Sequence, residues 1–424
     1  MTVTTTAATT GSRNSSNSRN SRSTGSAVPA AVSPGPVPVL WLALLATPIA
    51  AGANAPVLIL PDMARSLGVA DGTAAWLLTA FGWAMAVGTP LLAGLLRRRG
   101  LAAVLRLATV LVLAGTLLVA ASPWLPLTLI GRCAQAAGGA GLVAAAMSLA
   151  GSARRMGVIS AGFGMLGASG PLLGRTLADG ASWRLALAVQ AVSLLAVPVV
   201  LRRAGGGAPA PAGRFDARGA ALLTGLATAL VLLPTQPLAA LGAAAVAAVL
   251  LTLHVRRRPD GFVPVALLRR PVFVVSALLA LALSASYFTL LFSVPRLLAD
   301  RAGWDAASAG VWQLVALLAG SALSWLLAAA STRLGRAAVR TVLVAAGAAA
   351  ALTGILASSG PLLVVAAGLG VFTASAANGV LSTHAVASAP DEAHRPSAIG
   401  LFTLCYQLGG AFGPAVATLL VLGS

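Results

Sequence analysis

Polar side chains are rare within the long apolar segments of this sequence, so the few that occur there are the candidates for chemistry. Arg132 is the deepest charge, and Gln135 follows it one helical turn later on the same face. No Asp or Glu falls in the middle of an apolar segment, and Cys133 and Cys405 stand apart in different segments. The sequence therefore supports no carboxylate pair, metal cluster or disulfide, and we expect no cofactor, no bound metal and no enzymatic activity.

Arg132 should face a wet cavity or a polar partner, because an unpaired guanidinium at apolar depth costs several kcal/mol. It could contact a substrate or a gating network, or it could form a structural pair with Gln135 or with backbone carbonyls. Other polar and aromatic residues of the apolar segments are candidates for the same cavity: Asn54, Tyr287, Asn378, Trp312, Gln313, Tyr406 and Gln407. For each of them alone, hydrogen bonding between helices is an equally good interpretation.

The composition sets the class of protein that must position these residues. Of 424 residues, 58% are hydrophobic and 9% charged, whereas soluble domains carry roughly 25% charged residues. Apolar stretches of about 20 residues, the length that crosses a bilayer, follow one another, and only helices satisfy the backbone within each stretch. We therefore expect an all-α polytopic membrane protein with about thirteen spans, which start near Val37, Thr73, Ala102, Leu125, Met156, Trp183, Ala220, Pro237, Val272, Ala306, Ala338, Pro361 and Ser397.

The positive charge indicates the orientation of the spans. The formal net charge is +19, and every basic residue is Arg. The Arg clusters, for example 97–99 and 256–258, fall in every second loop, which places those loops in the cytoplasm and argues against a nucleic-acid partner. Residues 1–36 are too polar to bury anything and are expected to form a disordered cytoplasmic tail. An odd number of spans then places Ser424 outside.

Two breaks divide the apolar part of the sequence. Residues 204–213 are rich in Gly, Pro and Ala, and residues 256–270 are polar and contain Pro. We expect an N-terminal six-helix bundle at 37–203, a linker with an inserted two-helix hairpin at 204–270, and a C-terminal bundle of about five helices at 271–424.

A faint repeat supports the division into two bundles. The fifth span contains Gly167, Gly170, Pro171 and Gly174, and the last span contains Gly409, Gly410, Gly413 and Pro414. Small residues four apart let helix backbones approach closely, and Pro bends a helix. Ordinary glycine packing explains either segment alone equally well. We expect Gly170 to pack against the other bundle.

Four motifs, in this order, resemble the major facilitator superfamily, and specifically its fourteen-helix drug:proton antiporter branch. They are the external loop and second helix at 60–65 and 75–80, the fourth-helix motif at 129–138, the fifth-helix motif at 167–174 with Trp183 and Arg184, and the late-helix motif at 400–410. The resemblance implies a secondary active transporter of the plasma membrane that exports an amphiphilic organic compound or drug by alternating access. Its partners would be a small-molecule substrate, the lipid bilayer and, as coupling ion, protons.

The sequence departs from that branch in three places. We assign the cytoplasmic gate to Arg97 and Gly100, and it lacks the usual Gly and Asp, because Ala93 and Arg97 stand at those positions. The first-helix acidic position is Gly52. We expect thirteen helices rather than fourteen. Asp62, at the outer end of the first span, is then the best-placed proton site. The alternative function is a non-transporting, sensor-like or degraded relative. The chain has no Lys, so a nucleotide-phosphate loop of the Lys-Ser/Thr type is excluded.

Overall fold

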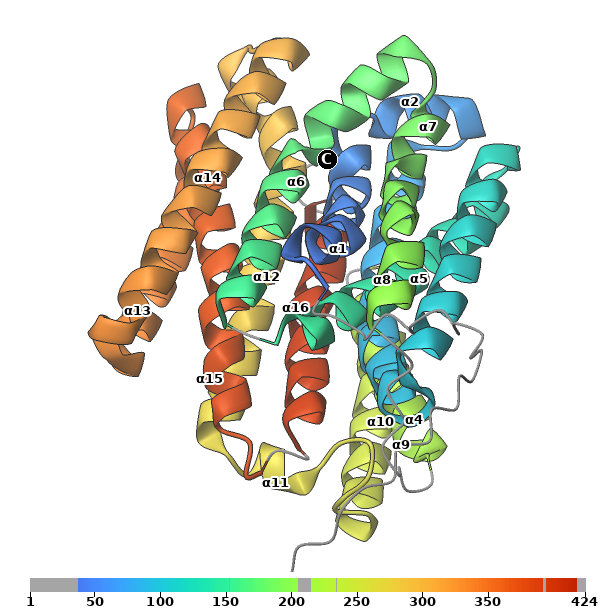
Figure 1. The fold of residues 1–424 in the computed structure, drawn as a ribbon. Coiled ribbons are helices and arrows are strands. Elements are labelled where there is room, and N and C mark those ends of the chain that lie inside the picture. The colour runs from blue at the N-terminus through green and yellow to red at the C-terminus, as the bar shows by residue number, and fades with distance from the viewer. Residues whose placement is uncertain (1–36, 152, 205–214, 234, 392–393, 418–424) are drawn as a thin grey trace, which may run out of the picture. The chain divides into compact units, whose positions relative to one another are not determined.

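The computed structural model describes residues 37–151, 153–204, 215–233, 235–391 and 394–417. This part of the chain is helical and contains no strand (Figure 1). The prediction of an all-α fold is confirmed. The predicted tail at 1–36 and Ser424 lie outside the described residues.

The N-terminal half begins with α1 and ends with α8. Its helices are α1 (Val39–Asn54), a 3-10 turn (Ala55–Leu58), α2 (Leu60–Leu67), α3 (Asp71–Ala74), α4 (Trp76–Ala121), α5 (Leu125–Ala150), α6 (Ala153–Gly180), α7 (Trp183–Ala188), a 3-10 segment (Val189–Ala196) and α8 (Val197–Ala204).

The inserted hairpin and the C-terminal half follow. The hairpin consists of α9 (Ala217–Leu232) and α10 (Pro237–Arg257). The C-terminal half contains α11 (Val265–Leu268), α12 (Pro271–Ala302), α13 (Ala306–Leu356), α14 (Gly360–Ala376), a π-helical segment (Ala377–Leu381), α15 (Ser382–Ala387) and α16 (Arg395–Ala417).

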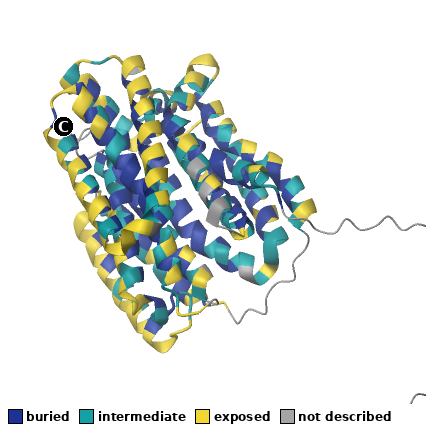
Figure 2. Cartoon of the chain, turned by 60° about the vertical axis from the view of Figure 1, so that its left-hand side comes forward, coloured by how far each residue is buried: buried dark blue, intermediate teal, exposed yellow. Residues whose placement is uncertain are grey.

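The helices agree with the expected spans. Eleven helical segments of the described chain are long and apolar enough to cross a membrane. Two further predicted spans correspond to α6, which is long but richer in Gly and polar residues, and to α9, an apolar helix of 16 residues. Figure 2 shows that exposed residues follow the outer helices, and large apolar side chains such as Leu117, Leu241 and Leu356 are among them. An apolar outer surface is what a bilayer solvates.

Two long helices each contain two spans, joined at a glycine. Gly100 in α4 has φ 76° and ψ 177°, and Gly335 in α13 has φ 73° and ψ 162°. Side chains with a Cβ are essentially excluded from this backbone region. Gly100, predicted as a gate residue, therefore makes the turn between the second and third spans, and Gly335 makes the corresponding turn in the C-terminal half.

The glycine-rich segments hold corresponding helix pairs together within each half. A Cβ added at Gly170 would lie 2.8 Å from the Ala51 carbonyl oxygen of α1, and one at Gly174 would overlap the Ala55 carbonyl. In the other half, a Cβ at Gly409 would lie 2.8 Å from the Ala285 nitrogen of α12. The prediction that Gly170 packs against the other bundle is therefore wrong, because its open face meets α1 of its own bundle.

The two halves meet through two other helix pairs, α4 with α16 and α6 with α13. A Cβ at Gly82 of α4 would lie 2.9 Å from the Ala411 Cα of α16, so these backbones are nearly in contact. A Cβ added at Gly164 of α6 would lie 3.7 Å from Ser321 Oγ of α13, so this contact is looser. Small residues therefore line the contact between the halves.

Asp216 fixes the start of the inserted hairpin. Its carboxylate accepts hydrogen bonds from the backbone N–H of Gly219 (3.0 Å) and of Phe262 (2.9 Å), and pairs with His254 Nε2 at 2.8 Å. Burial opposes ionisation of Asp216, but the hydrogen bonds from Phe262, Gly219 and His254 outweigh it and hold the pKa of this carboxyl below its ordinary value. The guanidinium of Arg98 lies 5.0 Å from the Phe215 ring centroid, which connects this junction to α4.

Candidate substrate cavity

A cavity lies between the two halves. It holds about 900 Å³ of empty space, counting the part that opens to solvent, and is lined by α1, α4 and α6 from one half and by α12, α14, the π-helical segment and α16 from the other. None of the lining residues that the structure describes is charged. The polar lining residues are Asn54, Ser160, Tyr287, Ser375, Asn378, Tyr406 and Gln407, and the aromatic rings include Phe81, Phe163, Phe288 and Phe292.

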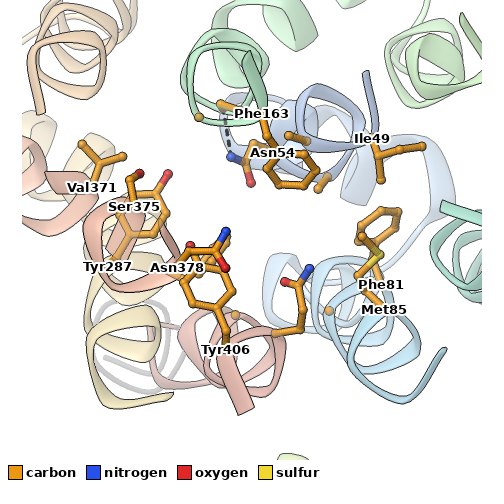
Figure 3. A pocket seen from close by; sticks show the side chains of 18 of the residues that line it. Ile49, Asn54, Phe81, Met85, Phe163, Tyr287, Val371, Ser375, Asn378 and Tyr406 are labelled. Carbon is orange, nitrogen blue, oxygen red and sulfur yellow. Dashed lines mark hydrogen bonds between the residues drawn. The ribbon is translucent and has the colours of Figure 1, made fainter. Parts of the chain in front are cut away.

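Rare residue types converge on this cavity. The sequence has two Tyr, and both line it. Asn54 and Asn378 are the only Asn after residue 20, and both line it as well. Figure 3 shows Tyr287, Asn378 and Tyr406 on one side of a common space, with Ile49, Phe81 and Met85 on the other. A chain dominated by Ala, Leu and Gly thus places its hydrogen-bonding side chains at one location.

Local breaks in helix geometry position these side chains. Asn54 ends α1, where the helix tightens into a 3-10 turn, and its Nδ2 donates to the Gly167 carbonyl of α6 at 2.9 Å. The Tyr287 hydroxyl faces Asn54 from the other half. Asn378 lies in the π-helical segment, a geometry that is frequent at functional sites. The Tyr406 carbonyl accepts a hydrogen bond of 2.7 Å from Ser284 Oγ, which fixes α16 to α12.

Arg132 and Gln135 lie behind the cavity wall rather than in it. Arg132 is fully buried, and its guanidinium stacks on the Phe81 ring, 4.2 Å from the centroid. It donates to Gln135 Oε1 at 3.1 Å and to the Gly52 carbonyl at 3.3 Å. Gln135 Nε2 in turn donates to the Leu187 carbonyl at 3.2 Å. The guanidinium thus has neutral polar partners, and its Nε has none.

Trp312 and Gln313 also lie away from the cavity. The side chain of Trp312 is 52% exposed and faces outward, because its position on α13 lies on the side away from the other helices. Gln313, one residue further, points inward and donates to the Leu291 carbonyl of α12 at 3.0 Å. The expectation that these two residues line the cavity is not met.

Asp62 lies outside the cavity, on α2. Its carboxylate forms ion pairs with Arg65 and with Arg175 of α6, the latter at 3.0 Å, and Arg175 also pairs with Asp179 at 2.8 Å. Protonation of Asp62 would weaken two ion pairs at once. The role of Asp62 as a proton site stays a prediction.

The sequence reasoning did not identify Ser160 and Phe163 of α6 as lining residues, nor Gln190 beside Arg132. Ser and Phe occur throughout the chain, so type alone did not separate them from residues that only pack. Gln190 carried a usable signal, because it is one of only a few amides within the apolar segments. The side chain of Arg97, predicted to form the gate, lies outside what the structure describes.

A helical membrane protein built of two corresponding halves around a central uncharged cavity belongs to the class of solute transporters. Residues 40–414 match the family model of the Major Facilitator Superfamily, and the chain belongs to that family. It is similar to the crystal structure of the human organic anion transporter MFSD10 (TETRAN), with a TM-score of 0.62 and 19% identity over 92% of this chain and 94% of that chain. At this identity the likeness concerns the fold. A comparison with curated proteins gave no match.

Proposed function

We propose that this protein is a secondary active transporter that exports an amphiphilic organic compound or drug across the plasma membrane by alternating access. The observation that carries the proposal is the convergence of Asn54, Tyr287, Asn378 and Tyr406 on one cavity between the halves. Ligand sites of this kind combine apolar and aromatic walls with a few polar groups that fix orientation. The rings would hold the apolar body of a substrate, and the amides and hydroxyls would bind its polar atoms.

The contacts between the halves suit a rocking motion. Gly82 and Ala411 bring α4 and α16 into close contact, and small residues also separate α6 from α13. Such contacts contain few interlocked side chains that would have to separate. Alternating access in this family is largely the movement of one helix bundle against the other around a central site.

Two further considerations concern the coupling ion and the substrate class. The resemblance to the drug:proton antiporter branch adds protons as the coupling ion, although the carrier would have to be a group other than a carboxylate of the cavity wall, because the lining residues include none. The printed name of MFSD10 describes that protein as an organic anion transporter. Amphiphilic organic anions therefore join amphiphilic drugs as the substrates to test first.

Transport by the purified full-length chain in liposomes tests the proposal. Asn378→Ala and Tyr406→Phe each remove a hydrogen bond worth about 1 kcal/mol, so each should raise the substrate KM by about fivefold. Trp325→Phe is the matched control, because Trp325 is 62% exposed on the outer surface, and it should leave KM unchanged. A protein that binds compounds in this cavity without moving any of them would favour the alternative, a sensor-like relative.

A further inference from the structure

Arg132 is a buried cation without a carboxylate partner. Its side chain is fully buried, and no carboxylate of the described residues lies within ion-pair distance of it. The acceptors of its hydrogen bonds, Gln135 and the Gly52 carbonyl, are neutral. Cation–π contact with Phe81 offsets only part of the cost of burying a charge. The site therefore has an uncompensated positive charge.

Buried polar atoms near this charge also lack hydrogen-bond partners. Arg132 Nε has no hydrogen-bond partner, and neither do the amide nitrogen and oxygen of Gln190, which is fully buried. Gln190 packs against Gly52, since a Cβ added to this glycine would lie 2.8 Å from Gln190 Cβ. Arg132 and Gln190 thus both contact Gly52, and each retains a free donor. Buried polar groups without partners are uncommon and call for an explanation such as an absent ligand or water.

One side chain separates this cluster from the cavity. Phe81 lines the cavity and, with the same ring, covers the guanidinium of Arg132. Figure 3 shows the Phe81 ring at the edge of the open space. Gly52 precedes Ala53 and Asn54, which also line the cavity. A change in the Phe81 rotamer would therefore uncover the Arg132 guanidinium on the side of the cavity.

We propose that Arg132 and Gln190 form an anion-binding subsite of the cavity, which rotation of Phe81 opens to the carboxylate or sulfonate group of an amphiphilic organic acid. The anion supplies the missing counter-charge and accepts hydrogen bonds from the free Arg132 Nε and the Gln190 amide. The apolar body of the acid remains among the rings of the cavity. This subsite rests on the proposed transport function and implies that the transported substrate is an anion.

The experiment compares two probes of the same shape and different charge, 2-naphthalenesulfonate and its neutral sulfonamide. Binding to the full-length protein in detergent and uptake into liposomes are measured for both. Because hydrogen bonds to charged groups are stronger than neutral ones, the native protein should prefer the sulfonate by about tenfold or more. Arg132→Gln should remove this preference. Arg132→Lys, which retains the charge, should still bind the sulfonate more tightly than the sulfonamide.

Three further variants separate the possible explanations. Gln190→Leu should reduce the preference without reversing it, and Phe81→Leu, which uncovers the guanidinium, should increase the preference for the sulfonate over the sulfonamide. Asn378→Ala serves as the control, because it lies across the cavity and should weaken both probes by the same factor. Equal binding of the two probes to the native protein, or an unchanged preference in a folded Arg132→Gln variant, would overturn the subsite. Absence of transport for every compound, with the charge preference intact in binding, would instead contradict the proposed function.

Discussion

Replacement of Gly174 by Ala tests whether the glycine-rich segment of α6 is a structural contact or only a product of composition. A Cβ at this position would overlap the carbonyl oxygen of Ala55, and it would lie 2.8 Å from the carbonyl carbon of the same residue. Both atoms belong to the backbone of the 3-10 turn that follows α1, so they cannot move aside as a flexible side chain would. The α6 backbone must therefore shift away from this turn.

The expected loss is the difference between two opposing effects. Overpacking of a well-packed interface costs about 1–3 kcal/mol, whereas Ala is favoured over Gly within a helix by up to about 1 kcal/mol. We expect Gly174→Ala to lower the stability of the protein by about 1–2 kcal/mol. Gly242→Ala in α10 is the matched control, because a Cβ there meets nothing within 4 Å. It should be neutral or stabilising.

The assay is the midpoint of thermal unfolding in detergent, with size-exclusion chromatography as a check of folding. Gly409→Ala repeats the test in the other half, where a Cβ would lie 2.8 Å from the Ala285 nitrogen of α12. Both variants should melt below the native protein, and Gly242→Ala should not. If Gly174→Ala melts at the same temperature as Gly242→Ala, the close approach of α6 to α1 does not depend on glycine.

Three other predictions concern topology, the outer ion pairs and the hairpin junction. If the Arg-rich loops are cytoplasmic, a reporter fused after Arg258 should be inside the cell and one fused after Ser424 outside; finding both on one side would contradict the span count. Asp62→Asn should remove the response of transport to a protonophore if Asp62 is the proton site; an unchanged response would show that this carboxylate only forms ion pairs with Arg65 and Arg175. Asp216→Ala should lower stability by about 1–2 kcal/mol through loss of the α9 cap. Because the pKa of Asp216 is lowered on folding, its contribution is present above its ordinary pKa of about 4 and disappears as the pH falls through the lower folded value. When the pH is lowered below about 4, the midpoint temperature of thermal unfolding should therefore fall in the native protein. The fall should be larger in the native protein than in Asp216→Asn.

The fold was largely predictable because bilayer solvation imposes a strong pattern. Spans must be long and apolar, and all thirteen predicted segments correspond to helices of the structure. The partner of Gly170 was not predictable in the same way. A glycine face indicates that some backbone comes close, but nothing in the spacing distinguishes α1 of the same half from a helix of the other half.

The cavity residues divide according to how much their chemistry restricts their location. Asn54, Tyr287 and Asn378 were found because polar groups are costly at apolar depth and therefore converge on a polar space. Trp312 was not placed correctly, since an indole is equally stable against lipid, and the helix phase of α13 turns it outward. Arg132 was recognised as deep, but the sequence could not show that the Phe81 ring separates it from the cavity.

The junction of the inserted hairpin lies beside the segment of α4 in which a gate is predicted. The gate positions that depart from the family pattern include Ala93, which lines a second, small cavity together with Phe262 and with Ser397 and Gly400 of α16. Phe262 belongs to the segment that follows the hairpin, and its backbone N–H is bound by Asp216 at the start of the hairpin. A residue from the hairpin junction therefore lies between α4 of one half and α16 of the other. Phe262 is thus held by Asp216 at the start of the hairpin and lines a cavity shared by α4 and α16. The inserted hairpin therefore contacts the region between the halves through this residue.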